Sequence, residues 1–121
     1  MDFDSLDTII SINIKKHGET MNCCIFTGYL VDDPQLRKHD GPSCCEFSMV
    51  TYEYRKNKAG QKQRIPTTLT FEAWASGAET IVNLASKGTK MTVYCAARNT
   101  EDIEDVIFRV NEFDFACLDK D

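Results

Sequence analysis

The chain has 121 residues, a length that suits one domain with a single hydrophobic core and leaves no room for a second catalytic lobe. Its formal net charge of −5 argues at first sight against a polyanionic partner. The acids, however, are concentrated at the ends: residues 1–8 carry three acids and no base, and residues 99–121 carry eight acids and two bases. Residues 9–98 are therefore net positive, by four charges.

The amino-terminal residues lack the positive charge and the apolar stretch of a signal peptide, and no apolar run is long enough to span a bilayer. We therefore expect a cytoplasmic protein without a membrane partner. The six cysteines are Cys23, Cys24, Cys44, Cys45, Cys95 and Cys117. Without a secretory signal, we expect reduced thiols that fill small apolar positions in strands. The absence of a Cys-x-x-Cys spacing argues against zinc, and we expect no cofactor.

The alternating segment of residues 9–16 places three isoleucines on one face and predicts a short strand. Longer β-like runs follow at residues 22–31, 45–54 and 67–74. The first of these ends at Asp32-Asp33-Pro34, because proline cannot donate to a strand ladder. The second and third flank a glycine-containing loop, which predicts one long β-hairpin.

After Trp74 the apolar residues change to helical spacing, with Ala78, Ile81, Val82 and Ala85 on one face. Ser76 is the expected N-cap of this short helix and Gly88 its expected left-handed stop.

Strands are then expected at residues 91–97 and 106–115. This order predicts a mainly β protein, a five-stranded OB barrel with one short helix between strands 3 and 4, a fold whose open face often binds oligonucleotides.

The loop of the predicted hairpin is the strongest functional signal. Residues 55–64 carry five positive charges and no carboxylate, and Tyr52 and Tyr54 precede them. Trp74 is expected on the polar face of its strand with Thr70 and Glu72, because Phe71 and Ala73 form the apolar face. Cations beside exposed rings suit single-stranded nucleic acid, since cations follow phosphates while rings stack on unpaired bases.

Each of these features also has a plainer interpretation. A tryptophan is usually largely buried in a core, a run of charges is usually a solvated turn, and the two tyrosines can cover the barrel rim. Catalysis has no support, because His17 and His39 lack a nucleophile partner. The acids of residues 101–105 lack the glycine and the ligand spacing of a calcium loop.

Several short stretches occur together at a specific spacing: Met21-Asn22, residues 25–30, Asp33-Pro34-Gln35-Leu36-Arg37 and residues 47–51. Trp74-Ala75 before the helix, and Lys87-Gly88 before Val93-Tyr94, continue the pattern. Over about residues 21–115 the chain thereby resembles the bacterial and phage single-stranded DNA-binding proteins.

The resemblance implies single-stranded DNA binding without sequence specificity or catalysis, in replication, recombination or repair, inside a bacterial cell or a phage-infected host. It implies base stacking on Trp74 and phosphate contacts along the hairpin. The full set of expected DNA-binding residues is Trp74, Tyr52, Tyr54, Arg55, Lys56, Lys58, Lys62, Arg64, Arg37, Lys87 and Arg98. It also implies a homo-oligomer, a dimer or a tetramer, and contacts with replication or recombination proteins.

The chain departs from the family pattern in several places. Arg55 stands where many members have a tryptophan, Thr68 occupies a second stacking position, and the loop after Arg98 is short and acidic. These departures favour the alternative of a primosomal-type adaptor that binds protein and only weakly binds nucleic acid.

The expected organisation is an extension at residues 1–20, the binding domain at 21–116 and a short acidic end at 117–121. Residues 1–7 resemble in composition the acidic recruiting tip of family members, which suggests partner docking or competition with DNA for the protein's basic groove. The plainer alternative is a frayed acidic terminus.

Overall fold

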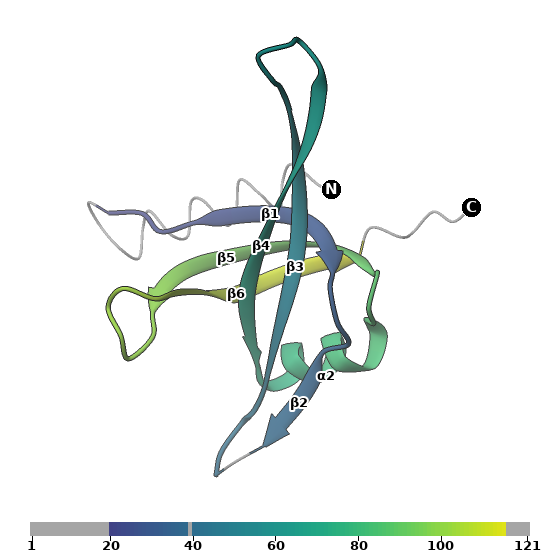
Figure 1. The fold of residues 1–121 in the computed structure, drawn as a ribbon. Coiled ribbons are helices and arrows are strands. Elements are labelled where there is room, and N and C mark those ends of the chain that lie inside the picture. Colours follow the sequence, from purple (N-terminus) through teal and green to yellow (C-terminus); the bar gives the residue numbers. More distant parts are fainter. Residues whose placement is uncertain (1–19, 39, 116–121) are drawn as a thin grey trace.

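A computed structural model of the chain describes residues 20–38 and 40–115 (Figure 1). The described elements are β1 (Cys24–Leu30), β2 (Gln35–Lys38), β3 (Ser43–Lys56), β4 (Lys62–Trp74), α2 (Ala75–Leu84), β5 (Lys90–Asn99) and β6 (Val106–Phe115). The strand predicted at residues 9–16, and the roles suggested for residues 1–7, lie outside the described residues. None of the helices in the described part is long and apolar enough to cross a membrane.

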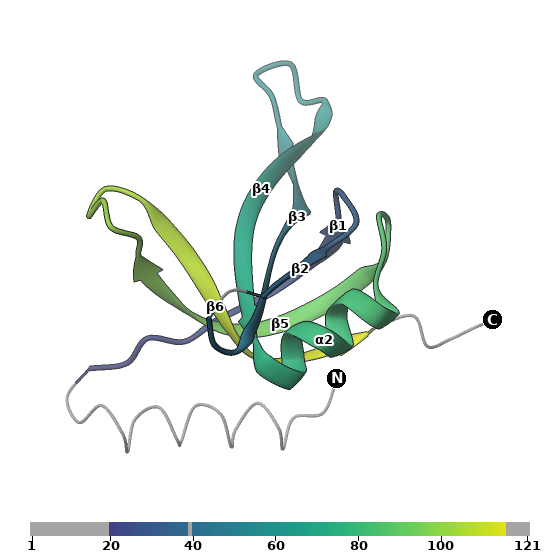
Figure 2. The ribbon, with the colours of Figure 1, turned by 90° about the horizontal axis from the view of Figure 1, so that it is seen from below.

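The strands form a closed barrel. Their order is β1, β5, β6, β4 and β3, and a pairing of β1 with β3 closes the ring. The short strand β2 pairs only with β3 and lies outside the ring. Figure 2 shows α2 at one end of the barrel and the hairpin of β3 and β4 projecting away from it. The predicted five-stranded OB barrel is confirmed, with its helix between the third and fourth barrel strands.

Buried and less buried residues alternate along the first part of β3, whereas residues 71–73 of β4 and 91–95 of β5 are buried without a break. Cys45, Phe47 and Met49 of β3 are buried, while the residues between them are less buried or exposed. Phe71 of β4 is fully buried, and its ring stacks on that of Phe47 with centroids 5.5 Å apart. Burying a side chain of this size contributes about 1.5–3 kcal/mol. Because a shift by one residue would expose these side chains, their burial fixes which face of the strand points inward.

Gly28 allows β1 to serve two neighbours. Along most of its length β1 pairs with β5, and at Tyr29 and Leu30 it pairs with β3. A Cβ at Gly28 would lie 2.5 Å from the backbone oxygen of Val50, closer than any side chain tolerates. The glycine is therefore needed for close approach where the barrel closes.

The helix begins and ends earlier than predicted. Its N-cap is Trp74 and not Ser76, because β4 runs directly into the helix without a loop. Its C-cap is Ala85, three residues before the expected stop. Gly88 does adopt the expected left-handed conformation, with φ +91°, but it closes the following turn, where its N–H donates to the oxygen of Leu30 at 2.8 Å.

The five cysteines in the described residues are free thiols. Burial raises the pKa of Cys45 to about 11 and that of Cys95 to about 12. Both side chains point into the barrel, so they pack as small apolar groups and remain protonated at neutral pH.

Candidate nucleic-acid interface

The basic segment predicted as a loop is mostly strand. The antiparallel ladder of β3 and β4 runs from Cys44 opposite Trp74 to Lys56 opposite Lys62, which leaves only residues 57–61 as the turn. Asn57 holds this turn, because its Oδ1 accepts hydrogen bonds from the backbone N–H groups of Ala59 and Gln61, both at 2.9 Å. The turn is therefore internally ordered, and its cations are presented from a defined backbone.

One side of this hairpin carries alternating tyrosines and cations. The ring of Tyr54, which is 59% exposed, lies under the Nζ of Lys62 at 4.8 Å. The ring of Tyr52 lies under the guanidinium of Arg64 at 4.2 Å. Both tyrosines are exposed and stand on the projecting arm, so they do not seal the barrel rim. Contacts of this kind contribute about 0.5–1 kcal/mol at exposed sites, and they hold the rings beside the charges.

The other cations of the hairpin differ in how far they are compensated. In the described part of the chain, Lys56, Lys58, Lys62 and Arg64 form no ion pair with a carboxylate. Arg55 does have a carboxylate nearby, since its Nη2 lies 3.4 Å from Oε2 of Glu53, just before the segment. The expectation of a fully uncompensated segment is therefore wrong at Arg55, although this exposed pair is weak.

Trp74 lies on the same side of the ladder as the tyrosines, at its opposite end. Trp74 is 43% exposed, which confirms the prediction that its side chain lies on the polar face. The chain turns sharply after it, because Trp74 is extended and Ala75 has φ +55°, a conformation that a residue with a Cβ rarely adopts. This turn fixes the ring where the strand meets the helix.

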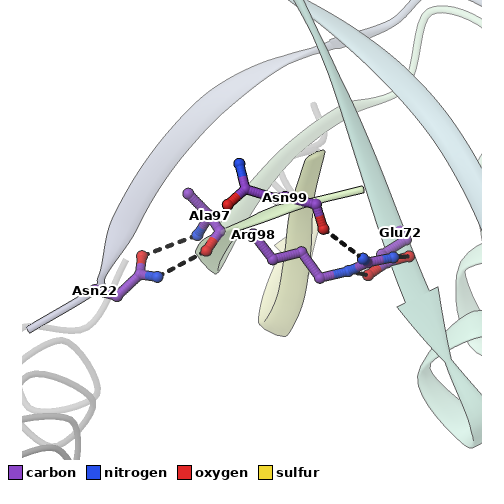
Figure 3. A network of polar contacts seen from close by, with 5 residues as sticks. All are labelled: Asn22, Glu72, Ala97, Arg98 and Asn99. Atoms are coloured by element: carbon purple, nitrogen blue, oxygen red, sulfur yellow. Dashed lines mark hydrogen bonds and ion pairs between the residues drawn. The ribbon is translucent and has the colours of Figure 1, made fainter. Parts of the chain in front are cut away.

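Between the tyrosines and the tryptophan, and close to the tryptophan, the face contains a buried carboxylate. Glu72 is only 3% exposed, and the guanidinium of Arg98 from β5 grips both of its oxygens (Figure 3). Arg98 Nη2 donates to Oε1 at 2.7 Å, its Nε donates to Oε2, and its Nη1 donates to the backbone oxygen of Asn99 at 2.9 Å. The hydrogen bonds from Arg98 hold the pKa of Glu72 below its usual range despite the opposing effect of burial.

A side-chain amide fixes the backbone that carries Arg98. Asn22 Nδ2 donates to the oxygen of Ala97 at 2.7 Å, and the N–H of Ala97 donates to Asn22 Oδ1 at 2.9 Å (Figure 3). This reciprocal pair resembles one rung of a strand ladder and lies two residues before β1 begins. In the sequence, Asn22 stands out only as part of the Met21-Asn22 motif. Nothing near it indicates this role, because its partner lies 75 residues away.

A second carboxylate lies directly opposite the first. Glu46 of β3 pairs with Glu72 of β4 in the ladder, and Nη2 of Arg37 from β2 lies 3.6 Å from Glu46 Oε1. Unlike the side chain of Glu72, both of these side chains are exposed. They border a shallow hollow whose other lining residues are Asp32, Asp33, Gln35, Phe47, Ser48 and Thr70.

The structure thus brings most of the expected site residues together. The tyrosines, the hairpin cations and Trp74 share the hairpin, and Arg37 and Arg98 reach the same face from β2 and β5. Lys87 lies apart, in the turn after α2, where its backbone N–H donates to Asp33 Oδ1 at 2.7 Å. Thr68, at the second expected stacking position, is exposed on the face but offers no ring.

Comparison with known proteins is consistent with this geometry. A model of the single-strand binding protein family matches residues 21–107. Two similar solved structures are of the single-stranded DNA binding protein from Thermus aquaticus. The wild-type structure has a TM-score of 0.66 at 22% identity, and a deletion mutant has 0.68 at 20%. Each alignment covers 78% of this chain and 50% of the other, so the chain spans half the length of those proteins. No curated protein matches significantly.

Proposed function

Because the chain belongs to the single-strand binding protein family, we propose that it binds single-stranded DNA with little sequence preference and without catalysis, in replication, recombination or repair. The observation that carries the proposal is the continuous face of β3 and β4. Exposed tyrosines under cations occupy one end of that face, and exposed Trp74 occupies the other. A strand lying along this face meets rings for its bases and cations for its phosphates.

The two kinds of contact have different physical consequences. Stacking of a base on an aromatic ring contributes about 1–3 kcal/mol and depends little on salt. Each phosphate neutralised on a single strand releases counterions and adds about 0.7 to the slope of log K against log salt. In this proposal Trp74, Tyr52 and Tyr54 act in the first way. The hairpin cations Arg55, Lys56, Lys58, Lys62 and Arg64 act in the second, with support from Arg37 and Lys87.

A protein-binding adaptor is the second candidate, and one observation favours it. The connection between β5 and β6 carries Ile103 at its tip, 79% exposed, among the four acids of residues 101–105. An exposed branched apolar side chain framed by carboxylates suits a protein partner better than it suits DNA.

Titration with oligo(dT) distinguishes the two candidates, because Trp74 is the chain's only tryptophan and therefore reports on its own site. If the proposal holds, the oligonucleotide quenches tryptophan fluorescence, and the affinity falls as salt rises. A duplex of the same length serves as the control and should bind more weakly. Absence of quenching at both low and high salt, together with no retention on immobilised oligo(dT), would refute DNA binding and favour the adaptor.

A further inference from the structure

Near Trp74, the proposed DNA face carries two carboxylates that are each paired with an arginine. Two glutamates stand opposite each other on β3 and β4, and each is held by an arginine from a strand outside the hairpin. These four charges sum to zero, and Arg109 of β6, beside Glu72 in the parallel ladder, adds one positive charge. The hairpin end of the face is strongly positive. The two glutamates differ in burial, with side chains 4% exposed at Glu72 and 43% at Glu46, whereas both arginines are partly exposed.

We propose that Glu72 withholds Arg98 from the DNA phosphates, so that Arg98, unlike the hairpin cations, adds nothing to the salt dependence of binding. This inference rests on the proposed function and deepens it, because it assigns Arg98 and the hairpin cations to different roles. The charge of Arg98 is already matched by the carboxylate that it grips with two hydrogen bonds.

Exchange of that carboxylate for a phosphate is opposed by the surroundings of the pair. If Arg98 left, Glu72 would remain as a buried charge without its main hydrogen-bond donor, which is strongly unfavourable. The backbone of Arg98 is also fixed, because Asn22 holds Ala97 on one side, and the guanidinium itself bonds to the oxygen of Asn99 on the other. Glu72 is therefore a positioning residue that determines which cations are available.

The variant Glu72→Gln tests the inference, because it keeps the shape of the side chain while leaving the charge of Arg98 unmatched. We expect the salt slope for oligo(dT) to steepen by about 0.7, as for one added phosphate contact. Relative to equal affinity of variant and wild type at about 1 M salt, this slope makes the variant bind about eightfold tighter at 50 mM and about threefold tighter at 200 mM. Glu46→Gln is the matched control on the opposite strand. It should change the slope by less, because Glu46 is exposed and lies 3.6 Å from Arg37, so it holds its arginine less firmly than Glu72 does.

A double variant, Glu72→Gln with Arg98→Gln, keeps the inference testable if the single variant does not fold. The inference predicts that the double variant has the same salt slope as the wild-type protein, since two neutral side chains replace a pair of opposite charges. A slope lower by about 0.7 would show that Arg98 already contacts a phosphate and would overturn the inference. An unchanged slope in folded Glu72→Gln would overturn it as well. By contrast, wild-type protein that does not bind oligo(dT) would overturn the proposed function itself.

Discussion

Replacing Lys56, Lys58 and Lys62 together with alanine should remove most of the salt dependence that the hairpin contributes. Lys56 and Lys62 face each other at the last rung of the ladder, Lys58 lies in the turn, and all three are exposed. At about 0.7 per phosphate contact on a single strand, three lost contacts flatten the slope of log K against log salt by about 2. The wild-type affinity should accordingly fall roughly 20-fold more than that of the variant between 50 and 200 mM salt.

The assay is the quenching of Trp74 fluorescence by oligo(dT) at a series of salt concentrations. The turn should persist in the variant, because its hydrogen bonds come from the side chain of Asn57 and from the backbone. Circular dichroism checks that it does. Lys90→Ala is the control, since Lys90 is an exposed lysine on β5, which is separated from β3 by β1, and its removal should leave the slope unchanged. An unchanged slope in the triple variant would place the DNA path elsewhere and refute the reasoning.

Three further predictions concern the stacking platform, the barrel closure and the buried carboxylate. Trp74→Ala should weaken oligo(dT) binding by about 1–3 kcal/mol in a gel-shift assay with the fold intact, and unfolding instead would assign the ring to the core. Gly28→Ala should destabilise the protein by about 1–3 kcal/mol in urea, because the new methyl group meets the backbone of Val50. Gly77→Ala, inside α2 with its nearest neighbour at 3.8 Å, should be neutral or stabilising by up to about 1 kcal/mol, and equal losses at both glycines would contradict the steric argument. Since the pKa of Glu72 is lowered from 4.5, its ion pair should stabilise the fold above that pH and lose this effect as the pH falls through the lower folded-state value. The stability difference from Glu72→Gln should therefore shrink in acid, and a constant difference would contradict the assignment.

Patterns within a few residues predicted the barrel and much of the site. Alternation around Phe47 and Phe71 was sufficient to assign inward and outward faces, and hence to place Trp74 outside. The extent of β4 was missed, because a run of lysine and arginine reads as a loop unless the partner strand is known. The four residues of β2 are all exposed, and its single apolar residue, Leu36, is too little to show an alternation.

Longer-range features of the site had no local signal. The ion pair between Glu72 and Arg98 joins residues 26 apart, and the amide contact of Asn22 joins residues 75 apart. Each depends on strand order and register, which composition and spacing do not specify. The start of the helix was also misplaced, because a serine is the usual N-cap whereas here the strand continues to Trp74 itself.

The dual pairing of β1 has a consequence for how the chain folds. Strand β1 forms its main ladder with β5. A hydrogen bond between the side-chain hydroxyls of Thr27 and Thr92 joins residues 65 apart. During synthesis the hairpin of β3 and β4 is complete before β5 emerges, so local pairing precedes ring closure. Folding rates fall as contacts become more distant along the chain, and the closing step should therefore be the slow one. In stopped-flow refolding, a substitution at Thr27 should therefore slow folding at least as much as it speeds unfolding, as expected for contacts that form in the rate-limiting step.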